Sequence, residues 1–385
     1  MGSASGMIWR WGVAGALVLV IGIGRVSLAD VTTERGSSIL IYPKIVFDSQ
    51  ALITNRYDTL IQISNTSNSL VFAHCFYVNA APLDPSQPPS VLNPPQWIEV
   101  DFDITLTKQQ PTHWLLSDGR PQTVAPKACD RVNHDCNGAG FNPGPVPPVP
   151  DPFVGELKCL EVDSAGAPIN GNHLKGEATI VNLPPARGDA SKYNAVGILG
   201  LNTDTNSNNS DTTLCLGGDV TTTCPTGAEY NACPETVILN HFAENATEPV
   251  YDEFLGAGLS HVRTELTLVP CSEDFENQAP KPVTVQFRIT NEFEELFSAS
   301  TTVTCWGNFH LLDVGRVFDV SVLGSRFAQT RMSSPDEQPG FIGVVEEFHN
   351  LGHAPMVVDT TRAALNLHGE GERVNGDVIL VPEGQ

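Results

Sequence analysis

The sequence predicts an all-β protein that contains two copies of one β-sandwich domain. Short apolar runs separated by turn-forming residues recur along the 385 residues of the chain. The content of Gly 33 and Pro 29 against only 17% charged residues is typical of a chain with many turns. In addition, a series of landmarks in the first half returns in the same order in the last third, which indicates an internal duplication.

The composition narrows the class of protein. A hydrophobic content of 41% is enough for a packed core and argues against general disorder. The formal net charge of −23 disfavours binding to nucleic acid phosphates or to anionic lipid. This negative charge is compatible with binding to divalent cations or to basic partners.

The N-terminus predicts export. Arg10 precedes the apolar run Trp11–Ile23, and Ser27-Leu28-Ala29 has small residues at the two positions that a signal peptidase reads. We therefore expect residues 1–29 to be a signal peptide that is cleaved after Ala29. The apolar run is short for a permanent membrane anchor. The mature protein is expected to be soluble, without membrane insertion, in the periplasm or outside the cell.

The first predicted domain spans residues 30–184 and begins with the strand Ser38–Pro43. Asp58–Asn79 reads as two strands joined by a polar turn, because β-branched and aromatic residues flank Asn-Thr-Ser-Asn. The Pro-rich residues 80–96 and the Gly- and Pro-rich residues 117–152 are expected to be surface insertions. Further strands are expected at Trp97–Leu106, Thr112–Leu116, Phe153–Val162 and Gly176–Leu183.

Residues 185–263 form a connecting segment, which either extends the first domain or makes a small subdomain. Extension is favoured because the segment has little apolar periodicity of its own. Tyr193–Leu201 and Glu235–Phe242 are expected to be strands. Glu248–Leu259 is the best candidate for a helix, which its Pro and its charges would keep short.

The second predicted domain, residues 264–385, repeats the landmarks of the first. Five matches occur in the same order: Leu266–Pro270 with Leu40–Pro43, Ile289–Asn291 with Ile63–Asn65, Cys305 with Cys75, Phe318–Val322 with Phe102–Leu106, and Phe341–Gly343 with Phe153–Gly155. Alternation along these strands predicts the buried residues. They are Ile61, Ile63, Phe102, Ile104, Leu106 and Trp114 in the first copy, and Val285, Phe287, Ile289, Phe318, Val320 and Val322 in the second.

Each copy offers six or seven short strands, which suits an immunoglobulin-like β-sandwich. The order of an ITN or ISN motif, a strand, and then FxG with another strand resembles immunoglobulin-like domains of secreted bacterial proteins whose role is unknown. That resemblance covers about two thirds of the chain. It implies the fold and gives no chemistry.

The nine cysteines of an exported chain are expected to form disulfides, with at least one left over. Cys129 and Cys136 flank a short loop and make the best local pair. Two of the three cysteines Cys215, Cys224 and Cys233 are expected to bridge. The remaining choices are Cys75–Cys159 and Cys271–Cys305, although spacing alone does not determine connectivity.

Two polar loops are candidate Ca²⁺ sites. Asn133, Asp135 and Asn137 present oxygen donors at alternate positions before Gly138, as at the start of a calcium loop, but the closing Glu is missing. Asp204, Asn206, Asn208 and Asp211 form a second incomplete set. The alternative in both loops is a solvated turn rich in Asn and Asp, and this alternative is favoured.

No catalytic motif is evident. Glu346, Glu347, His349 and His353 cluster in EEFHNLGH, but Gly352 interrupts any helix and the order of residues is not that of a HExxH zinc motif. Asp101 and Asp103 share a strand face and would form a glycosidase pair only across a cleft. Trp97, Trp114 and Trp306 are more easily explained by core packing than as a sugar-stacking platform.

The sequence therefore favours an exported, non-enzymatic protein that acts in surface structure, adhesion or partner binding, with an extracellular protein or a glycan as partner and no cofactor other than Ca²⁺. The alternative is a secreted hydrolase or carbohydrate-binding module whose site lies in the inserted loops.

Overall fold

The computed structural model is all-β, as predicted. It describes residues 31–51, 56–84, 87, 92–93, 95–120, 142–183, 190–201, 212–252, 256–353 and 357–382. The predicted signal peptide lies outside these residues. The helices of the described residues are α1 (Leu311–Val314), the 3-10 helix η2 (Arg316–Phe318) and α2 (Val320–Leu323). None of them has the length and apolar character that a membrane-spanning helix requires.

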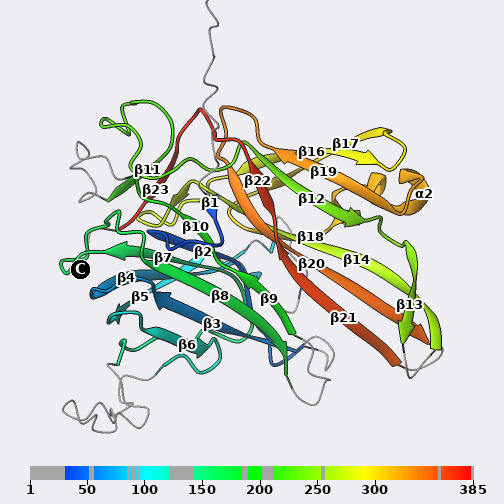
Figure 1. The fold of residues 1–385 in the computed structure, drawn as a ribbon, viewed down its shortest axis with the longest axis horizontal. Helices are drawn as coiled ribbons and strands as arrows, with labels where there is room; N and C mark the ends of the chain where they lie inside the picture. Colours follow the sequence, from blue (N-terminus) through cyan, green and yellow to red (C-terminus); the bar gives the residue numbers. More distant parts are fainter. Residues whose placement is uncertain are drawn as a thin grey trace, which may run out of the picture.

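Two sheets make up most of the first half of the chain (Figure 1). The six-stranded sheet has the order β1 (Val31–Thr32), β10 (Val196–Ile198), β2 (Ile39–Phe47), β7 (Phe153–Val162), β4 (Val71–Asn79) and β5 (Ile98–Leu106). The four-stranded sheet has the order β6 (Pro111–Leu115), β3 (Tyr57–Asn65), β8 (Leu174–Asn182) and β9 (Ala190–Asn194). Side chains from both sheets, such as Leu40, Ile61 and Trp114, form one buried cluster.

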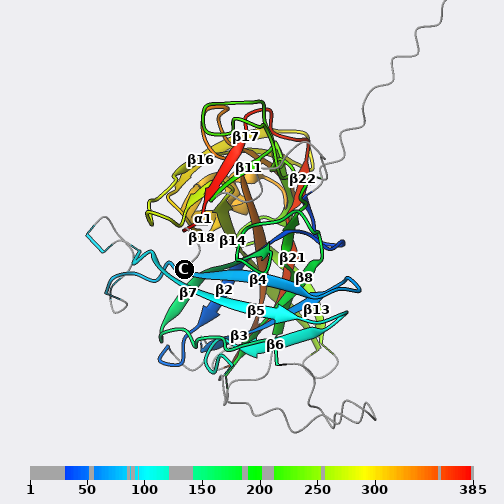
Figure 2. The ribbon, with the colours of Figure 1, turned by 90° about the vertical axis from the view of Figure 1, so that its left-hand side faces the viewer.

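Two further sheets make up most of the second half, and Figure 2 shows one of them, with β16 and β17, above the strands of the first half. The β16 sheet has the order β17 (Leu296–Val303), β16 (Val283–Asn291), β19 (Phe327–Ser333), β12 (Thr236–Phe242) and β22 (His368–Glu370). The β14 sheet has the order β13 (Thr247–Asp252), β14 (Gly256–Pro270), β20 (Phe341–His353) and β21 (Val357–Asn366), and β18 (Gly307–His310) also pairs with β14. Phe287, Leu266 and Phe318 belong to the buried cluster of this half.

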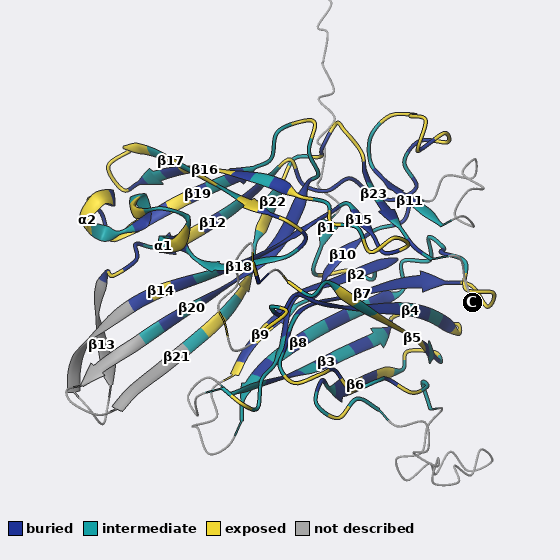
Figure 3. Ribbon diagram, turned by 180° about the vertical axis from the view of Figure 1, so that it is seen from behind, coloured by how far each residue is buried: buried dark blue, intermediate teal, exposed yellow. Residues whose placement is uncertain are grey.

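A small fifth sheet joins distant parts of the chain. It contains β11 (Thr213–Leu216), β23 (Asp377–Leu380) and β15 (Glu273–Asp274). A second buried cluster runs from Ile41 and Leu160 of the six-stranded sheet to Leu214, Val269 and Ile379. The six-stranded sheet is therefore buried on both faces at its centre, where Figure 3 shows β4 and β7 largely dark blue. Burial on both faces explains the apolar run Ile39–Tyr42 at the start of β2.

The predicted arrangement of two duplicated immunoglobulin-like β-sandwich domains is wrong. The described strands form five small sheets, a number that corresponds to the blades of a five-bladed β-propeller. Because the second cluster crosses between the two halves, neither half completes its core alone. The predicted boundaries at 30–184, 185–263 and 264–385 stay predictions.

The landmarks of the predicted repeat also differ in structure. Asn65 and Asn291 both end a strand and both bond to the turn that follows. However, Phe102 lies in β5, whereas Phe318 lies in η2 and the residues after it form α2. The helical turns leave Val320 half-buried and Val322 exposed, so the prediction that both lie in the core fails. The other ten predicted core residues are buried.

Most predicted strands are present, and the one predicted helix is wrong. Phe153–Val162 coincides with β7, and Trp97–Leu106 contains β5. Within the predicted helix Glu248–Leu259, the described residues belong to β13 and β14, which pair antiparallel. A hairpin of β13 and β14, whose second strand also pairs with β20, therefore replaces the expected helix.

Candidate functional site

A cleft lies where the two halves of the molecule meet, and we call it the junction cleft. Its volume is about 420 Å³. Lys44 of β2 and Tyr57 of β3 line it from the first half. The second half contributes side chains from β14, β18, β20 and β21. Its size falls within the range of about 300–1,000 Å³ that is usual for small-molecule sites.

Lys44 reaches the cleft because β2 is irregular at this point. The register between β2 and β7 shifts between Tyr42 and Ile45, where Pro43 has no N–H to donate. Such a bulge redirects the side chain that it carries. The bulge is bonded from both halves: Tyr193 bonds to the backbone N–H and carbonyl of Lys44, and Trp306 Nε1 donates to the Pro43 carbonyl at 2.8 Å.

Two carboxylates face Lys44. Glu265 of β14 and Glu346 of β20 lie directly opposite each other, an arrangement that is repulsive without a cation between them. Lys44 Nζ lies 2.5 Å from Glu346 Oε2 and also bonds to Glu265 Oε2. Burial alone would lower the pKa of Lys44, but the two carboxylates outweigh it and the net shift is upward. Burial would raise the pKa of Glu265, but Lys44 outweighs it and the net shift is downward.

His310 extends this row of side chains by one strand. It lies opposite Glu265 on β18, with its Nε2 3.8 Å from Glu265 Oε1. Burial is the main cause that lowers the pKa of His310, so its imidazole is neutral at neutral pH. Because Lys44 and Glu265 stay charged and His310 stays neutral, these three groups do not exchange protons near pH 7.

Two arginines border the same cleft. The Arg362 guanidinium lies 4.5 Å from the centroid of the Tyr57 ring and donates to the Ile180 carbonyl at 3.0 Å. Arg263 lies 5.6 Å from the centroid of the Phe348 ring. Cation–π contacts of this kind fix a guanidinium without neutralising it. Both arginines therefore keep their positive charge at the cleft.

A second buried ionic cluster lies deeper in the junction. Lys158 of β7 is fully buried, and its Nζ lies 3.3 Å from Glu156 Oε2 and forms an ion pair with Glu273 Oε2 of β15. Two carboxylates thus share one ammonium group in a dry environment. Burial, followed by the charge of Glu156, raises the pKa of Glu273 well above its ordinary value. Glu273 therefore keeps its proton to a higher pH than an exposed carboxyl group does.

The predicted Ca²⁺ residues cannot be compared with this cleft. Asn133, Asp135 and Asn137 lie outside the described residues, as do Asp204, Asn206, Asn208 and Asp211. No statement about metal binding follows for either loop.

The EEFHNLGH segment lies on β20, and alternation along the strand divides it between two faces. Glu346 enters the junction cleft. Glu347 bonds to His349 Nε2 at 2.6 Å, so these two form their own pair. His353 ends β20, and its side chain is outside the described set.

The carboxylate pair and the three tryptophans that the sequence analysis considered lie apart from the junction cleft. Asp101 and Asp103 flank His74, with His74 Nδ1 2.7 Å from Asp103. Trp114 is buried in the first cluster and donates to Tyr77 at 2.5 Å. Trp97 and Trp306 pack against the second cluster instead. The three tryptophans therefore do not share one exposed platform.

The disulfide pairing agrees with the prediction in part. The structure pairs Cys75 with Cys159, as predicted, and Cys215 with Cys224, two of the three that were expected to bridge. Cys271 pairs with Cys233 rather than with Cys305, which is buried and free. The predicted pair of Cys271 with Cys305 is wrong because Cys271, directly after β14, lies in one core cluster with Cys233. Cys129 and Cys136 are not among the described residues.

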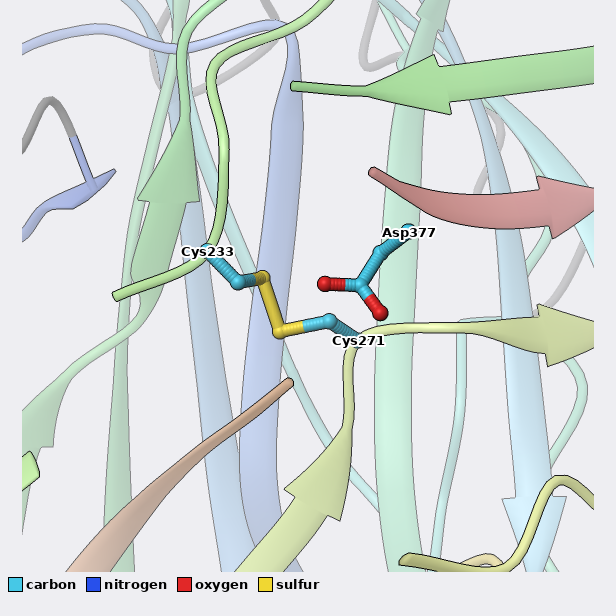
Figure 4. Close-up of side chains that lie close together, drawn as sticks. All are labelled: Cys233, Cys271 and Asp377. Atoms are coloured by element: carbon cyan, nitrogen blue, oxygen red, sulfur yellow. A yellow bond between two sulfur atoms is a disulfide. The ribbon is translucent and has the colours of Figure 1, made fainter. Parts of the chain in front are cut away.

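Cys233, Cys271 and Asp377 are the one group of three possible metal ligands in the part of the chain that the structure describes. Figure 4 shows that the two sulfur atoms are bonded to each other and that the Asp377 carboxylate lies beside them. A disulfide offers no thiolate to a metal. Asp377 Oδ1 already accepts bonds from Ser272 Oγ at 2.8 Å and from Gly340 N at 2.9 Å. The group thus stabilises the fold and is not a metal centre.

Comparison with known protein families and with curated proteins gives no match. Among solved structures, the chain is similar to one described as "a putative secreted protein" from Parabacteroides distasonis ATCC 8503. The two chains are 12% identical, and the similarity covers 88% of this chain and 90% of the other, with a TM-score of 0.16. So low a score carries no argument about fold or function. The predicted resemblance to immunoglobulin-like repeats has no support from these comparisons.

Proposed function

We propose that this protein is an exported, non-enzymatic binding protein and that the junction cleft is its recognition site. Three disulfides among the described residues fit an extracellular location. The observation that carries the proposal is the fixed charge pattern of the cleft. Lys44 bridges Glu265 and Glu346, and the pKa shifts keep Lys44 and Glu265 in their charged forms. Groups that stay charged recognise a ligand well but make poor general acids or bases at neutral pH.

A cleft-filling variant tests the proposal. Ala51 is half-buried and lines the cleft, so Ala51→Trp places an indole ring there. The matched control is Ala165→Trp, in an exposed turn away from the cleft. Each protein is applied to a printed array of extracellular oligosaccharides and peptides. We expect Ala51→Trp to lose the binding that the wild type and Ala165→Trp retain.

Two results would overturn the proposal. One is binding that persists in Ala51→Trp at the strength of the control, since recognition would then occur elsewhere. The other is a bound molecule that mass spectrometry recovers in cleaved or modified form, since the protein would then be an enzyme.

A further inference from the structure

We infer that the junction cleft binds an uncharged oligosaccharide, an inference that rests on the proposed function. The first argument is the balance of charge. The carboxylates at the cleft are Asp48, Glu265 and Glu346, and the cations are Lys44, Arg263 and Arg362. With His310 neutral, the charges cancel. An ammonium or carboxylate ligand would leave one charge in excess in a partly buried site, which is unfavourable without a partner.

The second argument is the set of polar atoms that the protein leaves for a ligand. Glu346 is 2% exposed, and its Oε1 has no hydrogen-bond partner among the described residues. Arg362 Nη1 lies 3.8 Å from this oxygen, too far for a hydrogen bond. His310 Nε2 lies 3.8 Å from Glu265 Oε1, which is likewise too far for a hydrogen bond. A buried carboxylate oxygen in this state favours a ligand that donates a hydrogen bond.

Asn308 adds donors to this set. Its amide oxygen accepts a bond from the Thr267 hydroxyl at 2.7 Å, which fixes the amide and leaves its N–H groups to donate. The cleft thus offers an acceptor at Glu346, donors at Asn308, and either role at His310. Hydroxyl groups both donate and accept, so a polyhydroxylated ligand satisfies all three residues without bringing a charge.

The third argument is the spacing between the strands that carry these residues. His310, Glu265 and Glu346 lie in register on the neighbouring strands β18, β14 and β20. Neighbouring strands are about 4.8 Å apart, so His310 and Glu346 are separated by roughly 10 Å. Hydroxyl groups on opposite sides of one sugar ring, with a hydrogen bond of about 2.8 Å at each end, span a distance of this order. The geometry therefore suits one sugar unit of the oligosaccharide between His310 and Glu346.

The test is calorimetric titration with the neutral oligosaccharide that binds best on a printed array, which also carries acidic and amino-bearing oligosaccharides and peptides. We expect His310→Ala to weaken binding at least tenfold. His74→Ala is the matched control because His74 is similarly exposed, at 26% against 28%, and also faces a carboxylate, but lies away from the cleft. Thermal unfolding verifies that both variants fold.

The outcomes separate this inference from the proposed function. Neutral oligosaccharide binding that His310→Ala weakens and His74→Ala preserves supports both. If the array instead shows only charged oligosaccharides or peptides, and His310→Ala removes their binding, the ligand class is wrong and the cleft remains the site. Binding that is the same in His310→Ala, His74→Ala and the wild type overturns the inference and the proposed function together.

Discussion

The buried trio of Glu156, Lys158 and Glu273 predicts an unusual dependence of stability on pH. Glu273→Gln replaces a carboxyl group by a neutral side chain of the same shape. In the folded wild type, burial and the charge of Glu156 raise the pKa of Glu273, so its proton is retained where the unfolded chain has lost it. A raised carboxyl pKa gives stability that is fully present below the unfolded pKa, here 4.5, and that falls as pH rises toward the folded pKa.

The size of the pH dependence follows because the folded and unfolded states differ by one bound proton at this site. Between the unfolded and the folded pKa, the wild type loses about 1.4 kcal/mol of unfolding free energy per pH unit at this site. The Gln variant has no such proton to lose. We therefore expect the two proteins to be similar in stability near pH 4 and the variant to become progressively more stable than the wild type toward pH 7.

Urea denaturation at several pH values measures this difference. The control is Glu276→Gln, three residues further along the chain, where the side chain is exposed. It should follow the wild type at every pH. If Glu273→Gln also stays parallel to the wild type from pH 4 to 7, the pKa of Glu273 is not raised in the folded protein and our description of this cluster is incorrect.

Three further predictions concern other parts of the structure. Lys44→Met leaves the buried Glu346 and the half-buried Glu265 without their cation and should reduce the unfolding free energy by about 3–5 kcal/mol. Lys192→Met, which removes an exposed ion pair, should cost less than about 1 kcal/mol in the same urea titration. Replacing Cys233 and Cys271 by Ser should cost about 2–5 kcal/mol, which thermal unfolding with and without reductant checks, since reductant should then affect the variant less than the wild type. Cys305 is buried and its pKa is raised, so a thiol reagent at neutral pH should label it only after denaturant is added, and rapid labelling of the native protein would contradict its burial.

The sequence predicts strands better than it predicts their arrangement. Alternation identifies β5 because Phe102, Ile104 and Leu106 face the core while Asp101 and Asp103 face solvent. The short sheet of β11, β15 and β23 could not be predicted. Its strands are four residues long or fewer and pair across more than a hundred positions, which leaves no local periodicity to detect.

The sequence contains weak indications of the residues that line the junction cleft and the deeper ionic cluster. A proline followed by a lysine inside the run ILIYPKIVF indicates a bulge and a redirected charge, yet the predicted strand ends at Pro43. Lys158 stands inside the strand FVGELKCLEV, where a charge among buried neighbours indicates a buried partner. The identity of that partner, Glu273, depends on the tertiary fold.

The return of β23 to β11 has a consequence for the order in which the chain folds. Ile379 reaches the cluster that also covers Ile41 and Leu160 of the six-stranded sheet. During synthesis, the cover over one side of that early sheet stays incomplete until almost the whole polypeptide has emerged. A chain shortened before Asp377 should therefore aggregate rather than give a smaller folded protein, because an apolar sheet face would remain open to other molecules.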